Sequence, residues 1–344
     1  MTAPPGKVLV VGPSWVGDMV ISQALYRYLA ASRPGVVIDV LAPAWSAPLL
    51  ARMPEVREAI DMPLGHGDLG LGRRRRLGHA LRERGYEQAI VLPNSFKSAL
   101  LPWIARIPVR SGWRGEMRYG LLNDLRVLDR AALPGLAARF AALGAPRDGP
   151  APAPPRPALR VEPARAHRVA REYGLAPRPP LLALCPGAEF GAAKRWPPQH
   201  YAELARHYLR RGWQVALFGS AADGPACAAV SAACDAPRAL TDLSGRTSLA
   251  EAIDLLSVAA LIVSNDSGLM HVGAALGRPV LGLYGPTSPL FTPPLHPRAA
   301  VLASDIDCAP CFARDCPLGH QRCLRDLQPG AVIERLAALE EVAV

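Results

Sequence analysis

The sequence predicts an α/β fold made of two Rossmann-like domains that face each other across a cleft. Three observations predict it. Apolar strand patterns alternate with helical patterns along the 344 residues, each half opens with a strand that runs into a glycine-containing loop, and a proline-rich segment separates the halves. A chain of this length, half of it hydrophobic, has room for about two domains.

The first domain is expected over residues 1–145. Strand patterns alternate here with helical patterns, and the first strand leads into the glycine loop of "VLVVGPSWVGD". The strands are expected at 8–11, 36–41 and 89–92, and the helices at 19–31 and 73–84. Alternation of this kind is typical of a parallel sheet that is covered by helices on both faces.

A linker is expected over residues 146–163, because the stretch "GAPRDGPAPAPPRPALRVEP" at 144–163 holds seven prolines in twenty positions. Proline at that density removes backbone donors that helix and sheet need. The second domain is expected over 164–330 and a C-terminal helix over 331–344. The strands of the second domain are expected at 181–185, 213–218, 261–264 and 280–284, and its helices at 198–211, 249–257 and 269–276.

Composition and charge narrow the function classes. No apolar run approaches the ~18 residues of a membrane-spanning helix, and the run at 8–11 is too short for a signal peptide, so a cytoplasmic protein is expected. The net charge of +10 is compatible with nucleic acid, anionic lipid and acidic small molecules. A nucleic-acid-binding protein is the non-enzymatic alternative. Against it, the arginines spread over both halves, without a basic motif that contains interleaved aromatic residues.

The stretch "IVSNDSGLMHVGAALGRPVLGLYGPTSP" at 262–289 carries the first chemical signal. An apolar strand runs into a helix that Ser267 would cap. The first N–H groups of such a helix attract phosphate, so Ser267 and Gly268 would admit a diphosphate and His271 would add a donor. Asp266 would repel phosphate, and its expected partners are sugar hydroxyls. A plain helix cap with locally bonded Asp266 and His271 is the alternative.

Loops elsewhere in the second domain would complete a donor site. In "CPGAEFGAAKRWP" at 185–197, Gly187 and Lys194 follow a strand of the same sheet, and Lys194 would reach a phosphate at its carboxyl edge. A surface lysine on a flexible loop is the alternative. Ser220 and Thr247, in two further loops, are expected to line a nucleoside pocket.

The first strand of the chain ends in "GPSWVGDMVIS" at 12–22. Its two glycines lack the spacing of G-x-G-x-x-G, which counts against a nicotinamide cofactor. The loop presents Asp18 at the start of a helix. Asp18 is either a general base in the cleft or an acid that interacts with the helix dipole.

Further polar residues of the first domain are expected to face the acceptor that reacts with the donor. They follow the strand that ends in "LPNSFKSAL" at 92–100, or lie a little later in "GWRGEMRYG". The residues expected to contact an acceptor are Asn94, Ser95, Lys97, Arg114 and Arg118. The alternative for the two arginines is a solvated surface position.

Seven cysteines, an odd number in a chain without an export signal, make a disulfide framework unexpected. Four of them cluster, and the spacing of the first two suits zinc, whereas the longer gaps do not form a standard pair of CxxC knuckles. These four are Cys308, Cys311, Cys316 and Cys323. Both a structural metal and reduced, metal-free thiols stay open. The single Asp-x-Asp triplet, at 305–307, is not at the end of a credible strand near the phosphate loops, so no metal and no other cofactor is expected in the reaction.

Taken together, these stretches resemble one family. "NDSGLMHVGAALGRPVLGLYGPTSP", "PGAEFGAAKRWP", "LPNSFKSAL" and "GPSWVGDM" are similar to motifs of the bacterial heptosyltransferases, family 9 of the glycosyltransferases, and the resemblance spans roughly residues 7–296. It implies the GT-B fold. It also implies transfer of heptose, with inversion, from ADP-L-glycero-β-D-manno-heptose to the first heptose of the lipopolysaccharide inner core.

The resemblance implies partners and roles as well. The partners are ADP-heptose and an anionic, lipid-linked acceptor at the cytoplasmic face of the inner membrane, where the protein would associate peripherally. By this resemblance, Asp18 would be the catalytic base, Lys194 would bind the donor phosphates and Asp266 would bind the heptose. The diphosphate would be bound at Ser267, Gly268 and His271. Where family members often carry an acidic residue for the nucleoside, this chain has "FGSAADGP" with Asp223. A sugar-nucleotide epimerase of the same fold, which needs no acceptor, is the enzymatic alternative.

Overall fold

The computed structural model describes residues 6–64, 70–234 and 240–341. The chain forms two compact units, Met1–Pro157 and Ala158–Val344. The division falls inside the expected linker. None of the helices in the described ranges is long and apolar enough to cross a membrane.

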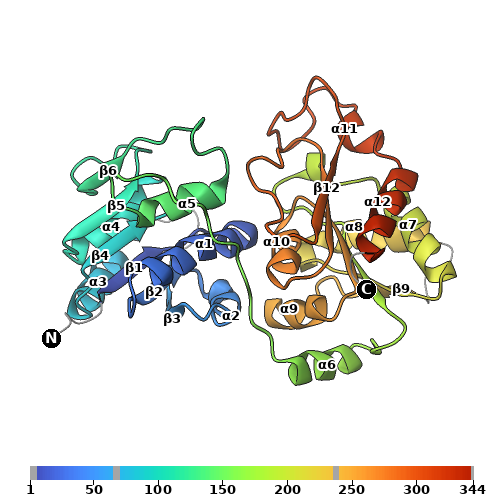
Figure 1. Cartoon of the computed structure of the whole chain (residues 1–344), viewed down its shortest axis with the longest axis horizontal. Coiled ribbons are helices and arrows are strands. Elements are labelled where there is room, and N and C mark those ends of the chain that lie inside the picture. Colours follow the sequence, from blue (N-terminus) through green and yellow to red (C-terminus); the bar gives the residue numbers. More distant parts are fainter. Residues whose placement is uncertain (1–5, 65–69, 235–239, 342–344) are drawn as a thin grey trace. The chain divides into compact units, whose positions relative to one another are not determined.

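The N-terminal unit contains a six-stranded parallel sheet in the order β3-β2-β1-β4-β5-β6 (Figure 1). Its strands are β1 (Lys7–Val11), β2 (Val37–Ala42), β3 (Val56–Asp61), β4 (Gln88–Val91), β5 (Val109–Trp113) and β6 (Asp124–Arg126). Its helices are α1 (Val16–Ser32), α2 (Ala47–Leu50), α3 (Leu71–Glu83), α4 (Phe96–Ile104) and α5 (Leu136–Gly144), with a 3₁₀ turn, η1 (Ala44–Ser46).

The central strand β1 shows why this sheet forms. After Lys7, its residues are apolar without alternation and buried, as expected for a strand that is covered on both faces. Leu9 and Val11 pack with residues of α3 and α4 in one core cluster, while α1 and α5 pack against each other. Parallel pairing sets Val10 opposite both Val40 of β2 and Ile90 of β4.

The C-terminal unit repeats this plan with the order β12-β11-β10-β7-β8-β9. Its strands are β7 (Leu181–Cys185), β8 (Gln214–Leu217), β9 (Leu240–Asp242), β10 (Leu261–Asn265), β11 (Val280–Tyr284) and β12 (Ala299–Ala303). Its helices are α6 (Pro163–Glu172), α7 (Pro198–Arg210), α8 (Gly224–Ala233), α9 (Leu249–Ser257), α10 (Gly268–Ala275), α11 (Arg322–Arg325) and α12 (Pro329–Glu341), with 3₁₀ turns η2 (Ala192–Lys194) and η3 (Ala221–Asp223).

Numbered from the start of its own unit, each sheet has the strand order 3-2-1-4-5-6 of a dinucleotide-binding Rossmann fold. The order reverses between β1 and β4 in one unit and between β7 and β10 in the other. In open parallel sheets, ligands bind at this switch point, beyond the carboxyl ends of the strands. The predicted α/β fold of two Rossmann-like units is therefore confirmed.

Candidate active site

The switch point of the C-terminal unit collects the residues expected to bind the donor. Gly187 and Lys194 follow β7, while Asp266 and Ser267 follow β10, and β7 pairs directly with β10. The carboxyl ends of parallel neighbours meet at the same sheet edge. Two loops that are about seventy residues apart in sequence are thus brought to one place.

A buried ion pair joins the two loops. The Nζ of Lys194 lies 2.7 Å from Oδ2 of Asp266 and 3.4 Å from the Asp266 carbonyl oxygen, and the two side chains are 13% and 6% exposed. Thr287, which follows β11, donates its hydroxyl to the same Oδ2 at 2.7 Å. A buried charge of this kind needs its partner, because removal of one leaves the other uncompensated.

His271 lies on α10 beside this pair. Its Nε2 is 3.9 Å from Oδ1 of Asp266, and the side chain is 6% exposed. Burial lowers the pKa of His271 to about 4; Asp266 opposes this effect and Lys194 adds to it. The imidazole is therefore neutral near pH 7, with one nitrogen to donate and one to accept.

The N-terminus of α10 supplies further donors. Ser267 occupies the N-cap position as predicted, but its side chain does not cap the helix. Its hydroxyl lies 2.9 Å from the hydroxyl of Ser264 instead. The first N–H groups of the helix therefore do not receive the cap oxygen of Ser267, and Gly268 places no side chain in front of them.

Asn265, the last residue of β10, was not singled out in the sequence. Its amide is fully buried and donates to the carbonyls of Pro186 and Gly187 at 2.7 and 3.3 Å. Its Oδ1 accepts from the Trp196 N–H at 3.1 Å and from the Tyr201 hydroxyl at 3.0 Å. Asn265 thus fixes both ends of the loop that carries Lys194. A polar residue at the end of a strand that begins with three apolar residues was the available signal.

Asp223 and Gly187 meet at the adjoining edge of β7 and β8. A Cβ on Gly187 would lie 2.3 Å from the carboxyl carbon of Asp223, so only glycine fits there. The same carboxylate accepts from the backbone N–H and the hydroxyl of Ser220 at 2.9 and 2.8 Å. Ser220 and Asp223 are therefore engaged with each other at the place expected for the nucleoside.

Thr247 lies on the same edge, after β9, and is half-buried. The next residue, Ser248, begins α9 through a reciprocal capping box with Glu251. The hydroxyl of Ser248 is bonded to the Glu251 carboxylate at 2.6 Å. The loop that contains Thr247 is held next to the end of β8, because the Gly245 N–H donates to the Gly219 carbonyl at 3.0 Å.

The cysteine-bearing segment supports the Lys194 loop. The Arg314 carbonyl accepts the Ala193 N–H at 3.0 Å, and the Arg314 guanidinium and the Lys194 ammonium both lie over the ring of Phe190, at 5.3 and 4.9 Å. Backbone N–H groups, chiefly that of Gln321, lower the pKa of Cys316. Cys308, Cys311, Cys316 and Cys323 are free thiols. Among the described residues, no three or more His, Cys, Asp or Glu side chains are grouped to hold a metal ion.

The switch point of the N-terminal unit holds the residues expected to act on the acceptor. Asp18 lies in the first turn of α1, directly after β1, and is half-buried. Asn94, Ser95 and Lys97 follow β4, the neighbour of β1. Asn94 is exposed, while Ser95 and Lys97 are half-buried. The topology therefore brings these four residues to one sheet edge.

Arg114 and Arg118 differ sharply. Arg114 is exposed, in the loop after β5. Arg118, expected to contact the acceptor, is only 1% exposed. Its guanidinium donates to the carbonyls of Pro93 and Trp113 and, at 3.3 Å, to Oδ1 of Asn94. This corrects the expectation, because Arg118 holds the turn that carries Asn94 and has no free face for a ligand.

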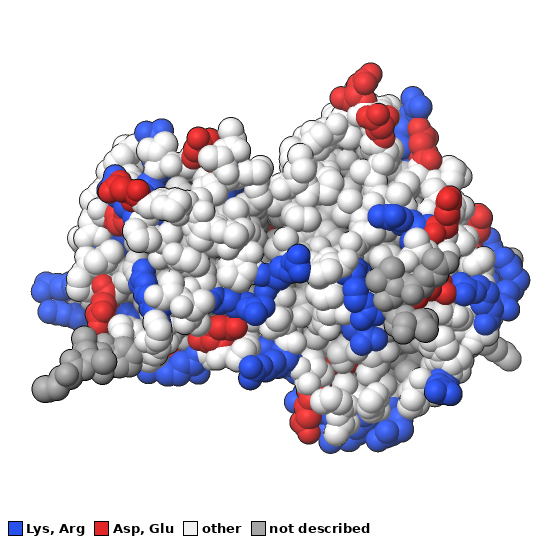
Figure 2. All heavy atoms as spheres, in the orientation of Figure 1, with Lys and Arg blue, Asp and Glu red and all other residues white. Residues whose placement is uncertain are grey.

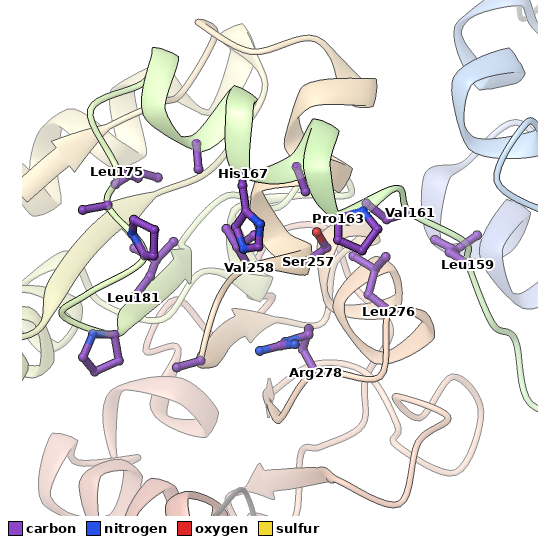
Figure 3. A pocket seen from close by; sticks show the side chains of 16 residues that line it. Leu159, Val161, Pro163, His167, Leu175, Leu181, Ser257, Val258, Leu276 and Arg278 are labelled. Atoms are coloured by element: carbon purple, nitrogen blue, oxygen red, sulfur yellow. The ribbon is translucent and has the colours of Figure 1, made fainter.

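A pocket of about 540 Å³ lies at the opposite edge of the C-terminal sheet. Figure 3 shows its mainly apolar lining, with His167 of α6 on one side and Arg278 on the other. Arg278 precedes β11, and Leu181, which also lines the pocket, begins β7. These are amino ends of strands, so this pocket is separate from the site around Lys194.

Charge on the face shown in Figure 2 is mixed. Basic side chains lie among acidic ones over that face and form no continuous stripe. A basic stripe is the electrostatic mark of many nucleic-acid-binding surfaces.

Comparison with known proteins assigns the chain to a family. The family model described as glycosyltransferase family 9 (heptosyltransferase) matches residues 74–321. Lipopolysaccharide heptosyltransferase 2 of Salmonella typhimurium is 52% identical over 342 residues, which cover 97% of this chain and 98% of that protein. The chain belongs to glycosyltransferase family 9.

Solved structures agree with membership of family 9. The structure of E. coli ADP-heptose lps heptosyltransferase II matches with a TM-score of 0.87 at 48% identity and covers 97% of this chain and 98% of that one. E. coli heptosyltransferase WaaC with ADP matches with a TM-score of 0.72 over 97% of this chain and 99% of that one, at 20% identity, a likeness of fold alone. The predicted family, the GT-B fold and the prediction of a glycosyltransferase are confirmed.

Proposed function

We propose that the protein acts as a lipopolysaccharide heptosyltransferase 2. It transfers L-glycero-D-manno-heptose from ADP-heptose to the first heptose of the lipopolysaccharide inner core, with inversion. The observation that carries this proposal is the 52% identity to lipopolysaccharide heptosyltransferase 2 of Salmonella typhimurium over 97% of the chain. The buried Lys194–Asp266 pair at a Rossmann switch point supports it.

The C-terminal unit binds the donor in this proposal. The Lys194 ammonium has three N–H groups, of which the contacts to Asp266 use two, so one remains for a phosphate oxygen. The free N–H groups at the start of α10, next to Ser267 and Gly268, bind the diphosphate, and neutral His271 adds a donor. Oδ1 of Asp266 accepts heptose hydroxyls, since Oδ2 already accepts from Lys194 and Thr287.

The nucleoside end of the donor lies beyond the carboxyl ends of β8 and β9. Gly187, Ser220 and Thr247 lie at this edge. The side chains of Ser220 and Asp223 are bonded to each other. A nucleoside would therefore contact the backbone groups of these residues and the exposed face of the turn that contains Asp223.

The N-terminal unit supplies the acceptor side of the reaction. The acceptor hydroxyl oxygen forms a bond to the anomeric carbon of heptose, while the bond from that carbon to the phosphate oxygen breaks and its electron pair leaves with ADP. The hydroxyl proton passes to the Asp18 carboxylate. Lys194 and the N-terminus of α10 stabilise the charge that develops on ADP. Asn94, Ser95, Lys97 and Arg114 position the acceptor.

The natural acceptor is lipid-linked and anionic, so the protein works at the cytoplasmic face of the inner membrane as a peripheral protein. Its net charge of +10 favours such a surface. Screening by salt should weaken the association.

One experiment tests the proposal directly. The protein is incubated with ADP-heptose and a mono-heptosylated core acceptor, and the products are read by mass spectrometry. Addition of one heptose to the acceptor is expected, with release of ADP. Isomerisation of the donor without acceptor would identify the epimerase alternative instead. An acceptor of unchanged mass would contradict the proposal.

A further inference from the structure

Exposed apolar side chains are unevenly divided between the units. Of the thirteen large hydrophobic side chains that are exposed in the described ranges, nine lie in the N-terminal unit, and these include Trp15, Trp45 and Trp103. Scattered exposed apolar residues are ordinary, whereas a group of them on one face marks an interaction surface. One such group lies on α4 and the loop beside it.

Helix α4 presents two aromatic rings to solvent. Phe96 and Trp103 are 40% and 51% exposed. They are seven residues apart, so they lie on the same side of the helix. Leu101 lies on the other side of the helix and is fully buried in the core of the unit, and the small side chain of Ala99, between the two rings, is buried as well. The two rings therefore stay exposed to solvent although the helix packs against the core.

The loop after β5 continues this surface. Met117 and Tyr119 are 78% and 64% exposed. The loop is tied to the start of α4, because the Glu116 N–H donates to the Asn94 carbonyl at 3.1 Å and the Glu116 carboxylate accepts the Phe96 N–H at 2.7 Å. We call Phe96, Trp103, Met117 and Tyr119 the α4 face.

Basic residues lie on the helix that packs against α4 and in the loop after β5. Helix α3 packs against α4 so closely that a Cβ on Gly78 would lie 2.5 Å from the Ile104 side chain (Figure 1). Arg74 Nη1 also donates to the Lys97 carbonyl at 3.1 Å. The exposed arginines of α3 next to this contact are Arg73, Arg75 and Arg76, and Arg106 and Arg114 are exposed at the end of α4 and in the loop.

Among the described residues of α3, α4 and the loop after β5, two are acidic. Glu116 is exposed, but its carboxylate is already bonded to the start of α4. Glu83 is exposed at the far end of α3. The described residues of these two helices and the loop therefore carry more positive than negative charge.

We propose that the α4 face is a membrane-docking surface whose partner is an anionic phospholipid bilayer. Tryptophan and tyrosine favour the boundary between lipid headgroups and acyl chains, and arginine favours anionic headgroups. The inference deepens the proposed function, because Lys97 and Arg114, assigned to the lipid-linked acceptor, belong to the same helix and loop.

The test is co-sedimentation with vesicles of phosphatidylethanolamine and phosphatidylglycerol, with phosphatidylcholine vesicles for comparison. The test variant is Trp103→Ser with Met117→Ser. The matched control is Trp45→Ser with Leu290→Ser, which removes a tryptophan and an aliphatic side chain that are 38% and 77% exposed elsewhere. The test variant should lose about tenfold or more in partition to anionic vesicles, while the control keeps the wild-type value.

A second readout separates docking from catalysis. On a water-soluble acceptor without acyl chains, the test variant should turn over like the wild type, and on vesicle-embedded acceptor it should be slower. Equal vesicle binding by test variant and wild type, equal loss in the control, or equal wild-type binding to phosphatidylcholine would each overturn the inference. Failure of the wild type on the soluble acceptor would count against the proposed function alone, because vesicle binding is measured without turnover.

Discussion

The two units share one strand order and differ in how their switch points are filled. In the C-terminal unit, Lys194 and Thr287 both bond to the Asp266 carboxylate, and Asn265 fixes the loop that carries Lys194. In the N-terminal unit, Asp18 and Asn94 lie at half-buried and exposed positions of the corresponding edge. One topology thus supports a prearranged polar site and an open one.

This difference fits two ligands of different kinds. A nucleotide sugar is small and constant in shape, so a rigid site of buried polar groups binds it without much rearrangement. An acceptor that is part of a membrane lipid is large and surface-bound, and an open edge beside an exposed aromatic face suits it. The fold supplies the edge, and the residues that follow each strand decide its chemistry.

The largest effect is expected at Asp18. Replacement by Asn keeps size and polarity but cannot take the acceptor proton at neutral pH, so turnover should fall by about 10²–10⁴. Steady-state rates with ADP-heptose and the mono-heptosylated acceptor check this. Turnover within a few-fold of the wild type would leave Asp18 as an acid that interacts with the dipole of α1, and the base would lie elsewhere.

The next effect separates the two units through their lysines. Lys194→Ala removes a charged donor to phosphate and should weaken ADP binding by about 1.5–3 kcal/mol. It also leaves the buried Asp266 carboxylate without its cation, so the melting temperature should fall. Lys97→Ala, in the other unit, is the control and should bind ADP as the wild type does. Weaker ADP binding in Lys97→Ala would remove the distinction between the units.

A smaller effect concerns pH and the C-terminal site alone. Because burial lowers the pKa of His271 to about 4, from an ordinary value near 6.5, the unfolded chain binds more protons than the folded one between these values. Stability should therefore fall as pH drops from about 6.5 to about 4, by up to about 3 kcal/mol from this residue. Urea midpoints across this range should depend less on pH in His271→Gln. An identical pH dependence in both proteins would show that His271 is not the cause.

The smallest effect is expected from chelation. In the proposed mechanism, Lys194 and the start of α10 provide positive charge for the departing ADP, so we expect turnover to survive EDTA. Elemental analysis of the purified protein must first show whether the segment from Cys308 to Cys323 carries zinc. Loss of a zinc ion there would disturb the loop that carries Lys194, because the Arg314 carbonyl accepts a hydrogen bond from that loop. Turnover that disappears in EDTA and returns with magnesium would contradict this expectation.

Much of the fold was predictable because the buried strands carry continuous apolar runs. The expected strands at 8–11, 181–185, 261–264 and 280–284 lie within one residue of β1, β7, β10 and β11. Strands nearer the sheet edges were not predicted from the sequence. β6 and β9 have only three residues each, with polar side chains, so no apolar period marks them.

The candidate site was predictable in position but not in its contacts. Glycine and polar residues directly after strands indicated the sheet edge, which placed Lys194 near Asp266. That these two pair with each other, that Thr287 joins them and that Arg118 is buried follow from side-chain packing across distant segments. A local sequence pattern does not contain that information.

We propose that the donor binds the C-terminal unit while the catalytic base comes from the N-terminal unit. Calorimetric titration of ADP into Asp18→Asn tests it most directly. ADP affinity equal to that of the wild type, in a protein whose turnover is lost, is the predicted result. Loss of ADP binding in Asp18→Asn would contradict the division of roles between the two units.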